Sequence, residues 1–114
     1  MAIKTKEVRI DTRVYTAREL TVDQIKAVCS DEAKEPVDRI LELLTYCSDA
    51  KVQDVGPLAP SEIRQLVDAI LEVNSDFFDF AAQLQMAAAA KQLEGLIKSI
   101  FLIRFLDSSI PATE

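Results

Sequence analysis

Residues 60–74, PSEIRQLVDAILEVN, carry the clearest helical pattern in this sequence. Apolar side chains recur there at a spacing of three and four residues, which places them on one face of an α-helix. They are Ile63, Leu66, Val67, Ile70 and Leu71. Pro60 and Glu62 suit the first turn of a helix, and Asn74 tolerates the left-handed conformation that often follows a last turn. The stretch therefore predicts a helix that ends at Asn74 and buries one face.

Two shorter helices are predicted before this one. Thr21 and Gln24 match a capping box, in which each side chain accepts a hydrogen bond from the other residue's backbone N–H, and Leu20 is placed to act as the hydrophobic staple. This helix is expected to end near Ser30, where an acidic run begins. Pro36 suits the first turn of the next helix, whose apolar stripe extends to Cys47. Residues 48–59 are expected to form a loop.

Residues 6–17, KEVRIDTRVYTA, predict a β-hairpin at the N-terminus. Val8 and Ile10 alternate with charged residues in the first strand, and Val14 and Thr16 alternate with their neighbours in the second. The dipeptide Asp11-Thr12 is expected to make the tight connection between them. Because two strands alone are only marginally stable, the hairpin is expected to pack against helices.

A fourth and longer helix is predicted after Ser75, because no proline follows until Pro111. We expect it to run continuously, or with a gentle bend, from residue 76 to about residue 107, with Ala87–Gly95 as its weakest part. Residues 108–114 would form a short tail.

The sequence thus predicts one mainly α-helical domain over residues 1–114, with a small N-terminal hairpin over residues 6–17. About four helices would lie between residues 21 and 107, the last of them long. The expected core comprises Ile25, Ile40, Leu41, Leu44, Ile63, Leu66, Val67, Ile70, Phe77, Phe80 and Leu84.

Composition argues against several classes of function. The chain has 114 residues, a net charge of −6 and no histidine, so it lacks the commonest general base and metal ligand. Cys29 and Cys47 lie on or beside apolar stripes and are interpreted as buried side chains rather than nucleophiles. The carboxylates between Asp31 and Asp38 are more typical of an acidic turn and helix start than of a cation site. We therefore expect no enzymatic activity, no metal and no cofactor.

Charge and hydropathy also limit the partners. The basic residues near the N-terminus are spread over the hairpin instead of forming a stripe, and the rest of the chain is acidic, so nucleic acid is not an expected partner. Residues 96–106 are strongly apolar but too short to span a bilayer, and Lys98 and Arg104 interrupt them. The charged N-terminus does not resemble a signal peptide, which predicts a cytoplasmic protein.

Two apolar features are candidate protein-binding sites. Phe77, Phe78 and Phe80 cannot all face the core, which leaves Phe78 as the one expected to be partly exposed. Apolar residues between 96 and 106 would cover most of a helix's circumference, and a face left uncovered would bind another copy of the chain or a partner. The predicted partner-binding residues are Phe78, Ile100, Phe101, Leu102, Ile103, Phe105 and Leu106. In the alternative, this helix lies at the centre of the bundle and is covered on all sides.

Three stretches, in this order, resemble the tail assembly chaperones of long-tailed bacteriophages, in particular the Mu-like and P2-like group. They are the hairpin of residues 6–16 followed by RELTV at 18–22, then LAPSEI at 58–63, and last VNSDFF at 73–78, and the resemblance covers about residues 6–80. The chain departs from the family pattern at Asp11-Thr12, where an Asp-Gly turn is more usual, and at Ala59, where a serine cap is expected.

The resemblance implies a non-enzymatic chaperone that binds the tape measure protein and keeps it soluble during tail assembly. It would act in the bacterial host cytoplasm and be absent from the finished virion. Self-association is expected from the apolar residues between 96 and 106. Because the sequence shows no concentrated charge patch beside the apolar candidate sites, binding is expected to depend only weakly on salt. Two alternatives remain open: a structural or regulatory helical subunit that binds one protein permanently, and a small metal-dependent hydrolase that uses only carboxylates.

Overall fold

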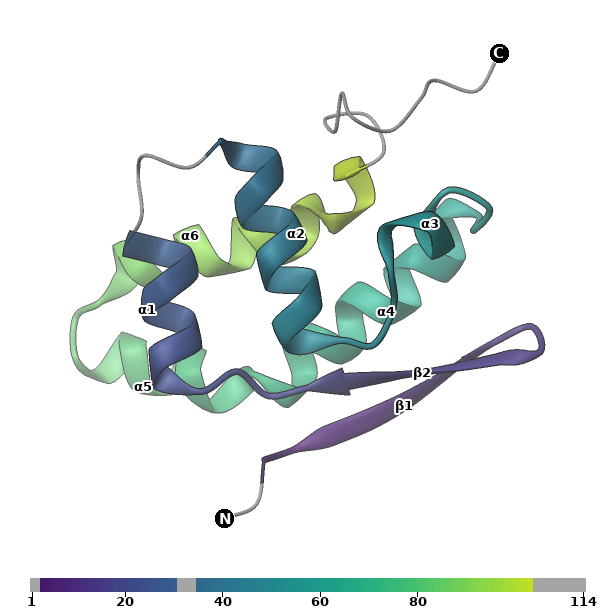
Figure 1. Ribbon diagram of the computed structural model, residues 1–114. Coiled ribbons are helices and arrows are strands. Elements are labelled where there is room, and N and C mark those ends of the chain that lie inside the picture. Colours follow the sequence, from purple (N-terminus) through teal and green to yellow (C-terminus); the bar gives the residue numbers. More distant parts are fainter. Residues whose placement is uncertain (1–2, 31–34, 104–114) are drawn as a thin grey trace.

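The structure is a computed structural model that describes residues 3–30 and 35–103. The described elements are β1 (Thr5–Ile10), β2 (Arg13–Arg18), α1 (Val22–Ser30), α2 (Pro36–Cys47), α3 (Val52–Val55), α4 (Pro60–Val73), α5 (Ser75–Gln83), α6 (Ala87–Lys98) and the 3₁₀-helix η1 (Ser99–Leu102). The mainly helical fold with an N-terminal two-stranded hairpin is confirmed (Figure 1). The expectation of about four helices is wrong, because this part of the chain contains six α-helices.

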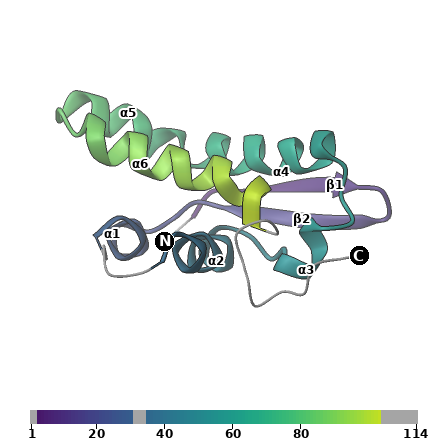
Figure 2. The same cartoon turned by 90° about the horizontal axis from the view of Figure 1, so that it is seen from above.

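Helix α6 lies at the centre of the bundle. Figure 2 shows it between α1 and α2 on one side and α4 and α5 on the other. The hairpin packs along α4 and also contacts α2 through β2. The largest fully buried side chains are Val28, Ile40, Leu43, Cys47, Leu66, Ile70, Asn74, Leu93, Ile97, Ile100 and Ile103. The core is therefore organised around α6 and η1, which correspond to the second half of the single long helix expected from the sequence.

The hairpin has the predicted position. In its second strand, however, the face with Tyr15 and Ala17 is buried, and the face with the β-branched residues Val14 and Thr16 is not. Asp11 has a φ of 57°, so it provides the left-handed residue of the two-residue turn, a conformation that aspartate tolerates. This short turn pairs Val8 with Tyr15 across the strands. Tyr15 therefore shares the buried face with Val8, while Val14 is 41% exposed.

Helices α1, α2 and α4 begin where the sequence predicts them. Thr21 and Gln24 form the expected capping box, with N···O distances of 3.0 and 3.1 Å. At the start of α4, Ala59 has no side-chain acceptor, and the Glu62 carboxylate accepts the Ala59 N–H at 2.8 Å instead. Leu20 is buried, as a hydrophobic staple requires. Local capping hydrogen bonds thus set the starts of α1 and α4, and Pro36 in the first turn marks the start of α2.

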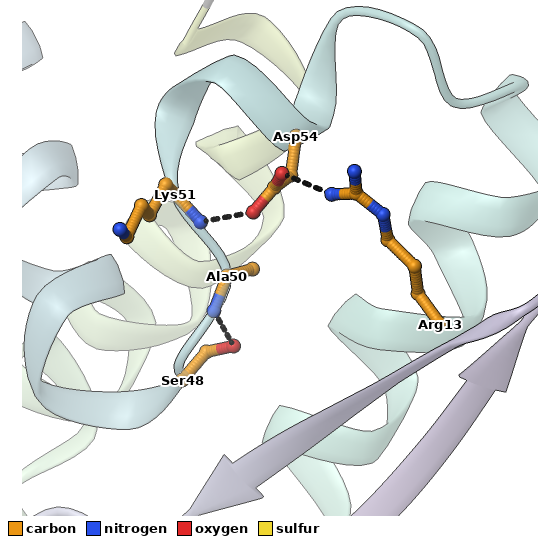
Figure 3. Close-up of polar contacts among 5 residues, drawn as sticks. All are labelled: Arg13, Ser48, Ala50, Lys51 and Asp54. Carbon is orange, nitrogen blue, oxygen red and sulfur yellow. Dashed lines mark hydrogen bonds and ion pairs between the residues drawn. The ribbon is translucent and has the colours of Figure 1, made fainter.

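The expected loop over residues 48–59 contains the short helix α3, which connects to the hairpin. Figure 3 shows the Asp54 carboxylate accepting the Lys51 N–H at 2.9 Å and the Arg13 guanidinium at 2.7 Å. In the same loop, the Ser48 hydroxyl oxygen accepts the Ala50 N–H at 3.0 Å. Asp54 therefore caps α3 and joins it to the strand that begins at Arg13.

Other polar contacts attach the hairpin to the helices. Lys4 pairs with Asp76 at 2.6 Å and Lys6 with Glu72 at 2.8 Å, both at exposed positions where ion pairs add little stability. The Arg18 guanidinium donates to the carbonyl oxygens of Thr45 and Ser48. Arg18 thereby satisfies acceptors that the C-terminus of α2 leaves without a helical partner.

Asn74 separates α4 from α5 through its side chain rather than through a left-handed backbone. Its φ is −101°, outside the left-handed region that the sequence suggested. The fully buried amide accepts the Leu20 N–H at 2.8 Å and donates to the Ile70 carbonyl at 2.8 Å. Asn74 thus connects the segment between β2 and α1 to the α4–α5 junction.

We expect Asn74→Ala to lower the free energy of unfolding by about 1–3 kcal/mol, because the buried Leu20 N–H would lose its acceptor. Urea denaturation followed by circular dichroism measures this loss. Gln65→Ala is the control, since Gln65 carries a similar amide at an exposed position of α4. Equal effects of the two substitutions would contradict the role assigned to Asn74.

The long continuous helix predicted from residue 76 to about residue 107 is wrong, because the chain reverses direction after α5. Gln85 has a φ of 59°, the Met86 N–H bonds to the Ala81 carbonyl, and the Gln85 N–H bonds to that of Ala82. These two bonds around a left-handed residue are the Schellman arrangement that ends helices. The break falls before Ala87–Gly95, the segment expected to be weakest, which instead forms most of α6.

Most of the expected core is confirmed, with two exceptions. Ile40, Leu44, Ile63, Leu66, Val67 and Ile70 are buried, and Ile25, Leu41 and Phe77 are partly buried against them. Phe80 and Leu84 were expected in the core but are 60% and 53% exposed. Phe80 lies on α5 and Leu84 is its C-cap residue, and both are on the side that the reversal of the chain leaves uncovered.

Candidate protein-binding surface

An apolar groove lies between α1 and α5, and we call it the α1–α5 groove. Its lining residues are Glu19, Leu20, Val22, Ile25, Asp76, Phe77, Asp79, Phe80 and Gln83. Val22 on α1 is 82% exposed and Phe80 on α5 is 60% exposed. Large apolar side chains gathered at the surface in this way are typical of protein-binding sites.

Two local features place these side chains at the surface. The capping box makes Val22 the first residue of α1, where it lies outside the bundle. Phe77 and Phe80 on α5 and Leu84 at its C-cap follow a spacing of three and four residues and share one face. Helix α6 packs against another side of α5, where Ala81 is buried. The face with Phe80 and Leu84 therefore has no helix over it in the part of the chain that the structure describes.

The rim of the α1–α5 groove is acidic. Glu19, Asp76 and Asp79 all line it. Lys4 approaches this rim from the N-terminal side of β1: its ammonium donates to Asp76 at 2.6 Å, and its backbone N–H donates to Glu19 at 3.1 Å. The hydrogen bond to Asp76 raises the pKa of Lys4 above its ordinary value, so this residue stays charged. One ammonium thus faces three carboxylates.

Phe78 lies apart from this groove, in a hollow between α5 and α6. It is half-buried, as expected, beside Ala82, Ala87 and Ala90. Its ring meets that of Phe77 edge to face, with centroids 5.6 Å apart. The small alanine side chains of α6 leave space for the Phe78 ring, so these residues shape the α5–α6 contact.

The remaining predicted partner-binding residues fall into three groups. Ile100 and Ile103 are fully buried, which corrects the expectation that they lie at the surface. Phe101 and Leu102 are 38% and 42% exposed, so they remain accessible to a partner. Phe105 and Leu106 lie outside the described residues. The structure therefore favours the alternative in which α6 and η1 are central, and it exposes only one side of η1.

Phe101 borders a second groove, between α4 and α6. Its apolar lining comes from α4, including Leu71, and from Phe101 of η1, whereas α6 contributes Glu94 and Lys98. Its charged residues form two ion pairs within the helices, Arg64 with Asp68 at 3.9 Å and Lys98 with Glu94 at 3.4 Å. Positive and negative charges are balanced on this rim, in contrast to the acidic rim of the α1–α5 groove.

The two cysteines are poor nucleophiles. Burial raises the pKa of the Cys47 thiol to about 12, and Cys47 is fully covered by the core. Burial also raises the pKa of Cys29, which is half-buried. Because the thiolate is the reactive form, both side chains are held in the unreactive thiol at neutral pH.

The described part of the chain offers neither a metal site nor a membrane-spanning helix. Within residues 3–30 and 35–103, no group of histidine, cysteine or carboxylate side chains could hold a metal ion. Asp31 and Glu32 of the acidic run lie outside those residues. In the same part of the chain, every helix is too short or too polar to cross a membrane.

Sequence reasoning missed the α1–α5 groove. The core expected from the sequence includes Phe80 and Leu84, and the structure exposes both. One feature of the sequence pointed to an exposed apolar residue here. Phe77, Phe78 and Phe80 lie within four residues and cannot all face the core. The structure exposes Phe80 more than Phe78.

No protein-family model matches this chain, and neither the curated proteins nor the solved structures contain a match. The resemblance to tail assembly chaperones therefore rests on the three sequence stretches. In the fold, residues 18–22 contain the start of α1, residues 58–63 contain the start of α4, and residues 73–78 span the α4–α5 junction.

Proposed function

We propose that this protein is a phage tail assembly chaperone that binds the tape measure protein and keeps it soluble in the host cytoplasm. The observation that carries the proposal is the α1–α5 groove, where Val22 and Phe80 are exposed side chains of a folded domain. A chaperone for an aggregation-prone helical client needs such an apolar surface, because it must cover the apolar residues through which client molecules would otherwise aggregate.

The position of the family-like stretches also supports the proposal. The first and the third form the two walls of the groove: Leu20 and Val22 belong to RELTV, and Asp76 and Phe77 to VNSDFF. The buried hydrogen bond between Leu20 and Asn74 joins these two stretches. The residues that carry the resemblance therefore shape the groove as well as the fold.

Co-expression tests the proposal. We expect the tape measure protein encoded with this chain to be recovered in the soluble fraction when both are expressed and to aggregate when it is expressed alone. Unchanged solubility with and without this chain would contradict a chaperone function. Recovery of this chain from purified, finished particles would favour a permanent structural subunit instead.

A further inference from the structure

We propose that the α1–α5 groove binds an amphipathic helix of the client whose apolar face is flanked by lysine and arginine residues. This inference rests on the proposed function and adds the chemistry of the client segment. It is carried by the juxtaposition of an exposed apolar floor and an acidic rim in one groove.

The apolar floor fits a helix. Val22 and Ile25 on α1 face Phe77 and Phe80 on α5, so both walls offer large side chains. Leu84, 53% exposed, is the C-cap residue of α5, four residues after Phe80, and extends the apolar stripe to the end of the helix. A groove with two helical walls accepts a third helix that inserts apolar side chains at positions i, i+3, i+4 and i+7.

The rim selects the charge of that helix. Glu19, Asp76 and Asp79 line the groove, and its described lining residues include no basic side chain. Lys4 reaches the rim and is already bonded to Asp76. The excess of negative charge attracts a helix with lysine or arginine beside its apolar face and repels one with carboxylates there.

A second copy of this chain is a poor occupant. Two copies related by a two-fold axis would bring the same surface together, so that acidic rim would meet acidic rim. The whole chain also has a net charge of −6, which opposes close approach of copies at this surface. Charge complementarity therefore favours a basic client helix over self-association here.

The test uses two synthetic helical peptides with identical apolar faces, one flanked by lysines and the other by glutamates. Fluorescence anisotropy measures their affinities for the full chain at low and high salt. We expect the lysine peptide to bind about tenfold more tightly, since Glu19 and Asp79, the two rim carboxylates that are not bonded to the Lys4 ammonium, each attract the lysine peptide and repel the glutamate peptide by a modest amount. The difference should shrink at high salt because the rim is exposed. This replaces the expectation of weak salt dependence, which assumed no local concentration of charge.

Two variants locate the binding. Glu19→Gln together with Asp79→Asn should weaken binding of the lysine peptide about three- to tenfold, whereas Glu7→Gln with Asp38→Asn removes two exposed carboxylates elsewhere and should leave it unchanged. Phe80→Ser should weaken both peptides. Equal affinity for the two peptides, or an effect of the control variant equal to that of the rim variant, would overturn the inference.

The outcome is separable from that of the co-expression test. A chain that solubilises its client but does not distinguish the peptides would overturn the inference about charge and leave the chaperone function standing. A chain that prefers the lysine peptide but fails to solubilise the tape measure protein would overturn the proposed function alone.

Discussion

Replacing Ile100 with aspartate is expected to unfold the protein, whereas the same replacement of its neighbour Phe101 should leave it folded. Ile100 is fully buried between α6 and the helices around it, while Phe101 is 38% exposed. Burying an unpaired carboxylate costs several kcal/mol, and a small domain is stable by only about 5–15 kcal/mol. Circular dichroism and urea denaturation of the two variants measure the difference.

This pair of variants also tests the position of η1. Both positions carry the same new side chain, so its helix propensity and charge are matched. If Ile100→Asp remained folded with an unchanged denaturation midpoint, Ile100 would not lie in the core and α6 would not be central. If both variants unfolded, the exposure assigned to Phe101 would be contradicted.

Leu66→Ala is expected to lower the free energy of unfolding by about 2–5 kcal/mol. Leu66 has no exposed surface, and it lies on α4 among the side chains that face the hairpin and α6. Removing its three distal carbon atoms leaves a cavity that close-packed neighbours can fill only partly. Chemical denaturation monitored by circular dichroism gives the change in stability directly.

Leu84→Ala is the matched control for this substitution. The same atoms are removed, but Leu84 is 53% exposed at the C-cap of α5, so we expect a loss below about 1 kcal/mol. A loss below about 1 kcal/mol for Leu66→Ala would place that face of α4 in solvent. A large loss for Leu84→Ala would contradict the exposed position assigned to Leu84.

Sequence patterns predicted the elements that local chemistry controls. The capping box at Thr21 and the proline at Pro60 set helix starts that the structure confirms, and the apolar stripe of residues 60–74 faces the core. The sequence also contains the information that decides which face of the second strand is buried. A two-residue turn at Asp11-Thr12 forces Tyr15 opposite Val8, and this constraint outweighs the β-branched preference for Val14.

The reversal after α5 could not be read from the sequence, because neither glycine nor proline marks it. Gln85 adopts the left-handed conformation at a position where glycine is usual. Packing of α6 against four other helices stabilises the reversal, and such contacts between distant residues leave no local pattern. Because this turn was not predicted, the α1–α5 groove was not predicted either. Phe80 and Leu84 are exposed because α6 folds back along another side of α5.

The most direct test of the α1–α5 groove as the client-binding surface is the soluble fraction of co-expressed tape measure protein with two double variants. Val22→Ser with Phe80→Ser alters the groove, and Phe101→Ser with Leu102→Ser alters exposed apolar residues of η1. Circular dichroism first establishes that both variants are folded. We predict that the groove variant loses the ability to keep the client soluble and that the η1 variant retains it. Full solubilisation by the folded groove variant would contradict the account.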